Sequence, residues 1–210
     1  RCARPPTTAP TRLPELRDVI DVTTSPPGYY HGRGTRRRGF SCAAVTRRGA
    51  LFTWGLNGAR QLLHQGLEVA RPRRVARFDG RPDVPERVLL AAMGHNFIAL
   101  AVVSDGRGGE PVSVQGRNLL TAGIFSRERR HLLRDWEQLR FVELRQLAAG
   151  AFHLAALTTR GDLYTMGSEY GWDRAEGNLL GHGEHHNDDD ELSDEDDGIL
   201  WGVAGTPMDP

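Results

Sequence analysis

The chain repeats one arrangement of apolar and polar positions: an apolar run, a tight turn that contains glycine, and a second apolar run. In its first appearance, residues 42–46 alternate along a strand-like run and residues 47–49 (Arg-Arg-Gly) form the turn. Residues 51–54 (Leu-Phe-Thr-Trp) follow, and such β-branched and aromatic side chains suit a pleated, half-buried surface. Because glycine adopts a left-handed backbone at little cost, the pattern predicts a β-hairpin.

A constant spacing relates the copies of this hairpin. The motif Ala-Ala-x-Thr-x-Arg-Gly-x-Leu-x-Thr-x-Gly spans residues 43–55 and returns at residues 155–167, so its turn glycine recurs at an offset of 112 (161 − 49). A degraded middle copy covers residues 99–106 and 111–116, with Gln115 where the first copy has Trp54. The offset therefore contains two repeats with a period close to 56, and internal periodicity of this kind defines the architecture.

A further strand-like run lies upstream of each hairpin. Two of these runs end at Gly94 and Gly150, which are one period apart (150 − 94). The matching run before the first hairpin is residues 18–22, and residues 23–38 then form a surface insertion. The repeat-structural residues are therefore Gly49, Trp54, Gly55, Gly94, Gly106, Gly116, Gly150, Gly161 and Gly167.

One such unit is a small antiparallel sheet that cannot bury both of its faces alone. Stacking successive units around an axis buries the faces, as in β-propellers. A β-sandwich is the alternative for short, evenly spaced strands, but it does not require the same turn at a constant period. We therefore predict an all-β fold, a partial β-propeller of about three blades with long loop insertions, over residues 16–183.

Between residues 39 and 183 the sequence resembles the regulator of chromosome condensation repeat family. The first copy carries residues 54–57 (Trp-Gly-Leu-Asn), 61–66 (Gln-Leu-Leu-His-Gln-Gly) and 72–75 (Pro-Arg-Arg-Val), although Arg60 and Leu63 stand where the family has glycine. The third copy has Met166 in the place of tryptophan, and residues 177–183 resemble the Gly-Gln-Leu-Gly segment of the family.

The resemblance implies a seven-bladed propeller when the fold is complete. We accordingly read the sequence as a divergent fragment, in which residues 199–210 begin a further repeat. One helix is also expected between strands, over residues 126–140, because Leu132, Trp136 and Leu139 recur at helical spacing and Ser126 can cap the start. We expect its apolar stripe to pack on the rim of the propeller.

Charge is divided unevenly along the chain, although the formal net charge is zero. Residues 184–210 hold ten acidic residues and no arginine, and residues 184–198 are predicted to be an acidic, disordered insertion. Ser193 precedes Asp-Glu-Asp and is a candidate phosphosite. Residues 1–15, rich in Pro and Arg, are also predicted to be disordered.

The cationic residues are all arginine, and several cluster in the first insertion. Arg33, Arg36, Arg37 and Arg38 form a basic loop that is a candidate polyanion-binding site, with a solvated loop as the alternative. Arginine pairs bidentately with carboxylate and phosphate groups.

Catalytic and cofactor chemistry find little support in the sequence. No nucleophile elbow, phosphate-binding loop or dinucleotide fingerprint occurs, and His153 is better explained as a structural residue of its repeat. Residues 182–186 (His-Gly-Glu-His-His) could contact a divalent metal, but nothing in their spacing defines a coordination geometry. We therefore expect no catalytic residue, no metal and no cofactor.

Two further observations concern location. No apolar run approaches the ~20 residues of a membrane span, so no membrane partner is expected. The two cysteines, Cys2 and Cys42, do not suggest a disulfide framework, and an intracellular location in cytoplasm or nucleus is expected.

Two functions from different classes remain. The first is a propeller interaction module, a scaffold or regulatory domain that binds a protein partner through a loop face. The second, implied by the family resemblance, is guanine-nucleotide exchange on a small Ran-type GTPase with chromatin association. Binding of nucleic acid or histones through arginine-rich loops is a weaker third hypothesis.

Overall fold

Three four-stranded antiparallel sheets form the body of the protein. The computed structural model describes residues 9–26, 28–32, 35–104, 116–123, 133–167 and 202–204. Blade 1 contains β1 (Val19–Thr24), β4 (Ser41–Thr46), β5 (Leu51–Leu56) and β6 (Glu68–Arg74). Blade 2 contains β7 (Glu86–Met93), β8 (Phe97–Ser104), β9 (Gly116–Gly123) and β10 (Arg134–Asp135). Blade 3 contains β11 (Leu144–Ala149), β12 (His153–Thr158), β13 (Leu163–Gly167) and β14 (Gly202–Ala204).

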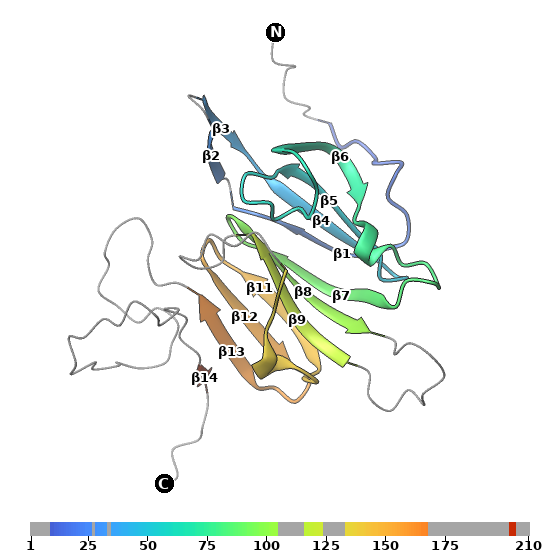
Figure 1. Ribbon diagram of the computed structural model, residues 1–210, viewed down its shortest axis with the longest axis vertical. Coiled ribbons are helices and arrows are strands. Elements are labelled where there is room, and N and C mark those ends of the chain that lie inside the picture. The colour runs from blue at the N-terminus through green and yellow to red at the C-terminus, as the bar shows by residue number, and fades with distance from the viewer. Residues whose placement is uncertain are drawn as a thin grey trace, which may run out of the picture.

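Within each blade the strands pair in the order in which they follow one another, apart from one inserted hairpin, β2 (Gly28–Gly32) with β3 (Thr35–Gly39). Two single-turn 3-10 helices, η1 (Ala76–Phe78) and η2 (Glu137–Leu139), complete the described elements. The three sheets lie face against face in succession, with blade 2 in the middle (Figure 1). The predicted all-β, partial propeller of three blades is confirmed.

The repeat period can be read directly from the strands. The second strands of the blades begin at Ser41, Phe97 and His153, and the two intervals between these starts are equal (97 − 41 and 153 − 97). The first strand of every blade also carries an irregularity of register near its start, at Ile20, Leu89 and Arg145. The irregularity thus recurs at the same repeat position in the first strand of all three described blades.

A glycine lies at the end of the third strand of blades 2 and 3 and one residue before the end in blade 1, where it meets the segment before the second strand. A Cβ atom on Gly55, Gly123 or Gly167 would lie 2.0, 2.2 or 2.5 Å from the carbonyl oxygen of Phe40, Asn96 or Phe152, respectively. All three glycines also have positive φ angles. No other residue fits these positions, because its Cβ would overlap backbone.

The sequence-based alignment of the middle repeat was wrong at this point. Gly116 was placed at the end of the third strand, but it begins β9 and pairs with Ser104. Gly123 ends the strand and pairs with Phe97, as Gly55 pairs with Ser41 and Gly167 with His153. The cause is the long connection between β8 and β9, residues 105–115, which takes the place of the short turn at residues 47–50 in blade 1. Gly106 and Gln115 lie in that connection, outside the described residues.

The helix expected over residues 126–140 is absent from its described part, residues 133–140. This segment instead forms β10 and η2, and Trp136 has an extended backbone. The backbone N–H of Trp136 donates to Leu119 O (3.0 Å) and its indole N–H donates to Thr121 Oγ1 (3.0 Å). Pairing with the edge of β9 therefore outweighs the helical period. Trp136 and Leu139 are nevertheless buried against the blades.

The first insertion is shorter than predicted. β1 extends to Thr24, and the N–H of Ser25 donates to Ser41 O (2.8 Å). Gly94 and Gly150 make the same bond to Phe97 O and His153 O in blades 2 and 3 (3.0 and 2.9 Å). The inserted residues therefore leave the blade after Ser25 and return at Ser41.

Two apolar clusters join the blades, and blade 2 contributes to both. Along β8, Ile98, Leu100 and Val102 pack into the cluster shared with blade 1, whereas Phe97 and Ala99 pack into the cluster shared with blade 3. Burial of each Leu or Ile side chain contributes roughly 1.5–3 kcal/mol. The strand alternation thus joins the three sheets into one stack.

Candidate interaction surface

The hairpin turns of the blades lie at one end of the strands, which we call the turn face. Its described segments are the first hairpin turn (residues 47–50), the loop after η1 (residues 79–85) and the third hairpin turn (residues 159–162). The inserted β2–β3 hairpin joins the opposite strand ends, after β1 and before β4 (Figure 1).

The first hairpin turn is held by three hydrogen bonds. The N–H of Thr46 donates to Ala50 O (3.0 Å), and the N–H of Gly49 donates to Thr46 O (2.8 Å). The hydroxyl of Thr46 accepts from the N–H of Ala50 (3.1 Å). Gly49 has a φ of 80°, which favours glycine. The exposed side chains of Arg47 and Arg48 thus project from a rigid base.

The start of blade 2 and the loop before it pack closely against this turn. A Cβ atom on Gly49 would lie 2.5 Å from Arg87 Cβ, and one on Gly80 would lie 2.8 Å from Ala50 N. The N–H of Val88 donates to Gly49 O (3.0 Å). Because two glycines let the backbones approach, Arg87 at the start of β7 is placed beside the turn.

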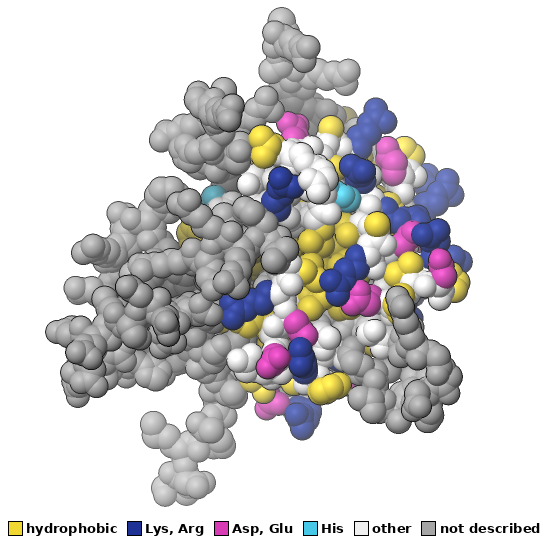
Figure 2. All heavy atoms as spheres, viewed as in Figure 1, with side chains coloured by type: hydrophobic (Ala, Val, Ile, Leu, Met, Phe, Trp, Pro, Cys, Tyr) yellow, Lys and Arg dark blue, Asp and Glu magenta, His cyan; other side chains and the backbone are white. Residues whose placement is uncertain are grey.

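A hollow of about 500 Å³ opens where these segments meet. We call it the arginine hollow; it is lined by Arg47, Arg48, Gly80, Arg81, Pro82, Val84 and Arg87. The lining includes no acidic residue of the described chain. Arginine side chains gather on this side of the molecule, along the right-hand edge of the view (Figure 2).

Carboxylates at the edge of the hollow orient Arg81. Arg81 Nε lies 2.7 Å from Asp79 Oδ2 and 3.8 Å from Asp83 Oδ1. Asp79 also pairs with Arg74 (2.7 Å), so its charge is shared between two guanidinium groups. The surroundings of the hollow therefore keep an excess of positive charge.

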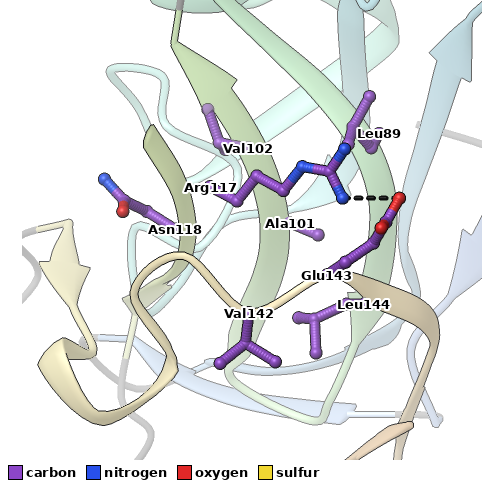
Figure 3. A pocket seen from close by; sticks show the side chains of 8 residues that line it. All are labelled: Leu89, Ala101, Val102, Arg117, Asn118, Val142, Glu143 and Leu144. Atoms are coloured by element: carbon purple, nitrogen blue, oxygen red, sulfur yellow. Dashed lines mark ion pairs between the residues drawn. The ribbon is translucent and has the colours of Figure 1, made fainter. Parts of the chain in front are cut away.

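The seam between blades 2 and 3 differs in charge. There, Arg117 on β9 and Glu143 just before β11 point toward each other and form an ion pair (Figure 3). The space beside them is only about 30 Å³. Glu143 stands one repeat period after Arg87 (143 − 87), so the same repeat position carries opposite charges in the two seams. In the described part of the second seam, the arginine is thus paired with a carboxylate and little open space lies beside the pair.

The arginines singled out from the sequence lie elsewhere. Arg36, Arg37 and Arg38 belong to β3, where they pair with His31, Tyr30 and Tyr29 of β2. The expected basic loop is therefore a β-hairpin over these three residues, because the tyrosines favour a strand and the Gly-rich sequence between favours a turn. This hairpin lies at the strand ends opposite the turn face, so it does not contribute to the arginine hollow.

Several other predictions fall outside the described residues. These are Arg33, the phosphosite Ser193, the acidic insertion of residues 184–198, the histidines at 182–186 and residues 1–8. His153 is exposed, and its ring lies against Gly150, where a Cβ would be 2.1 Å from His153 Cε1.

Sequence reasoning did not single out the residues of the arginine hollow. Arg47 and Arg48 were visible as an adjacent pair in a hairpin turn, which was the available signal. Arg81 and Arg87 lie beside that turn because blade 2 packs on blade 1. A local sequence pattern does not predict such packing.

Burial shifts the titration of three groups near the blades' ends. It raises the pKa of the Cys42 thiol and lowers the pKa of His64 and of His95. Within the described part of the chain, no group of three or more His, Cys, Asp or Glu residues is placed to hold a metal ion. No helix there has the length and apolar character needed to cross a membrane.

Comparison with known proteins gives matches among solved structures. No protein-family model matches the chain, and no curated protein matches it. Human WBSCR16 is 22% identical with a TM-score of 0.45, covering 71% of this chain and 34% of that chain. Prp20p from Saccharomyces cerevisiae, described with its binding to Gsp1p and histones, is 17% identical with a TM-score of 0.49, covering 75% and 33%. Yeast RCC1 (Prp20) bound to Kap60 is 18% identical with a TM-score of 0.47, covering 69% and 30%.

The chain therefore spans about a third of the length of the solved structures that it matches. At these TM-scores the likenesses assign neither a partner nor an activity to it.

Proposed function

We propose that this chain is a propeller interaction module, a non-catalytic scaffold or regulatory domain that binds a protein partner through its turn face. The observation that carries the proposal is the arginine hollow. Arginines from three segments meet there, whereas Glu143, at the repeat position of Arg87, forms an ion pair with Arg117 in the described part of the second seam.

Rigidity of the surrounding backbone supports this function. The first hairpin turn is fixed by its own hydrogen bonds and by the bond from Val88 to Gly49 O. A binding surface that is already ordered loses little conformational entropy on association. Arginine is enriched at the energetically dominant positions of interfaces because its fork-shaped group pairs with acidic partners.

The partner that fits this surface is a protein with negatively charged groups. Exposed arginine side chains attract such a partner over a distance of about one Debye length, near 8–10 Å at physiological ionic strength. Complementary charge then mainly sets the rate and specificity of association.

Photo-crosslinking tests the proposal at residue level. A photoreactive amino acid would replace Arg48 in one version of the full chain and Arg160 in another, because residue 160 is the repeat equivalent of residue 48. We expect adducts with a protein partner from position 48 and none from position 160. Equal adducts at both positions, or none at position 48, contradict the proposal.

Guanine-nucleotide exchange, which the family resemblance implies, is the alternative. A GDP-release assay with a Ran-type GTPase separates the two functions. The scaffold proposal expects the release rate to stay at its spontaneous value, and acceleration by the chain would instead favour exchange.

A further inference from the structure

We infer that the arginine hollow recognises a phosphate monoester on the protein partner, that is, a phosphorylated serine or threonine side chain. This inference rests on the proposed function and specifies the chemical group that the turn face binds.

The number and type of the cations favour phosphate. A phosphorylated side chain carries nearly two negative charges and three strong acceptor oxygens near neutral pH. Arginines from three segments line the hollow, and a guanidinium group carries N–H donors in a planar fork that matches phosphate oxygens. A single carboxylate has two oxygens and one charge, so it complements several neighbouring guanidinium groups less well than phosphate does.

The size of the hollow favours a peptide over a nucleic acid. Its volume of about 500 Å³ lies within the roughly 300–1,000 Å³ typical of sites for compact ligands. Single-stranded nucleic acids bind through aromatic stacking platforms along an extended basic groove. The side chains lining the hollow include no aromatic residue, and the described lining is one local concavity.

The wall between the arginines is suited to a peptide backbone. Pro82 and Val84 are the apolar members of the lining, and they offer contact to the residues that flank a phosphorylated side chain. The carboxylates of Asp79 and Asp83 orient Arg81 before any ligand binds. The guanidinium is thus pre-organised at the edge of the site, as tight recognition requires.

The third hairpin turn supplies a natural control. Arg160 occupies the place of Arg48 two repeats later, and a Cβ atom on Gly161 would meet nothing within 4 Å. The Arg160 side chain is 81% exposed and lies 3.8 Å from Asp162, a carboxylate in the place that Ala50 holds in the first turn. Within the described residues, the third turn therefore carries the same motif without the segments that line the hollow at the first turn.

Fluorescence anisotropy on the full chain tests the inference. The probe is a labelled peptide of otherwise neutral residues with one phosphoserine, and the comparison is the same peptide with serine. We expect the phosphopeptide to bind at least about tenfold tighter, since a charge-assisted hydrogen bond contributes about 1.5–3 kcal/mol. The double variant Arg47→Gln/Arg48→Gln should remove that preference, and Arg160→Gln should keep it.

Each other outcome overturns the inference. Equal affinity for the two peptides excludes phosphate recognition, and unchanged binding by Arg47→Gln/Arg48→Gln places recognition elsewhere. An oligothymidine that binds more tightly than the phosphopeptide, and loses binding in the same variant, assigns the hollow to nucleic acid. Thermal unfolding of each variant confirms that the fold is intact, and Arg48→Gln alone serves if the double variant unfolds.

The failure of this inference is distinguishable from failure of the proposed function. Crosslinking from position 48 would be repeated after the extract is treated with a phosphatase. An adduct that persists shows protein binding without phosphate recognition, which rejects the inference alone. Absence of any adduct before treatment rejects the proposed function as well.

Discussion

The first and third hairpin turns share one backbone design and differ in what surrounds them. In both, a threonine hydroxyl accepts the N–H four residues later, Thr46 from Ala50 and Thr158 from Asp162 (3.1 and 3.0 Å). In both, the following glycine has positive φ. At the first turn, Arg87 at the start of β7 and Gly80 in the preceding loop lie against the backbone, whereas a Cβ atom on Gly161 meets no described residue within 4 Å. The repeat therefore encodes the turn, and the contact between blades creates the hollow.

The largest expected effect is a difference in stability between alanine substitutions at the two turn glycines, Gly49 and Gly161. Gly49→Ala forces a left-handed alanine and pushes its Cβ into Arg87 Cβ, so we expect a loss of about 2–4 kcal/mol in the free energy of unfolding. A Cβ atom on Gly161 meets no described residue within 4 Å, so we expect only the backbone cost of about 1 kcal/mol from Gly161→Ala. Urea unfolding of both variants measures the difference. Equal losses would show that blade 2 does not press on the first turn.

The shared hydrogen bond should give similar losses in the two turns. Thr46→Val and Thr158→Val each remove a buried hydroxyl acceptor from a backbone N–H, at a cost of about 1–2 kcal/mol. Chemical unfolding of the two variants, with wild type as reference, checks the pair. A much larger loss in one turn than in the other would contradict the common design.

Removing the Arg117–Glu143 ion pair from the second seam should lower the free energy of unfolding by a small amount. Glu143→Gln removes the partner of Arg117 at a partly exposed site, so we expect a loss of about 0.5 kcal/mol that shrinks at high salt. Comparing thermal unfolding at low and high salt measures it. A loss that does not depend on salt would show that Glu143 contributes by packing rather than by charge.

The smallest effect is a pH dependence in the same seam. Burial lowers the pKa of His95, whose backbone N–H donates to Ala151 O and whose ring contacts Phe152. The folded state therefore favours the neutral ring, and its stabilisation is present above the unfolded pKa near 6.5 and is lost as the pH falls through the lowered value. His95→Gln should flatten stability against pH below about 6.5. An unchanged slope would assign the acid sensitivity to another group.

The repeat made much of the fold predictable from the sequence. Its constant period predicted three blades, and the family resemblance identified Arg60 and Leu63 as replacements of glycine. Both have positive φ angles, 62° and 60°. The nearby Asn57 side chain explains why the loop keeps this shape, since it bonds to His64 O, Gly66 O and Leu62 N (2.9, 2.8 and 2.9 Å).

The repeat pattern did not predict the insertions or the contacts between blades. The role of Gly123 at the end of β9 was not predicted because residues 105–115 lengthen the middle hairpin. A fixed repeat spacing does not account for a local insertion. Trp136 and Leu139 lie at helical spacing, yet edge pairing with β9 holds Trp136 in an extended conformation, and Leu139 belongs to the short 3-10 helix η2. The arginine hollow depends on which blade covers which turn, and that is a property of packing rather than of any segment.

Backbone amide chemical shifts during titration with the phosphoserine peptide test the central claim most directly. We predict that the signals of Arg48, Gly49 and Arg81 move with a common saturation curve, whereas those of Arg160 and Gly161 stay in place. Equal movement at both hairpin turns, or movement at the third turn alone, would contradict the claim that the covered turn forms the binding surface.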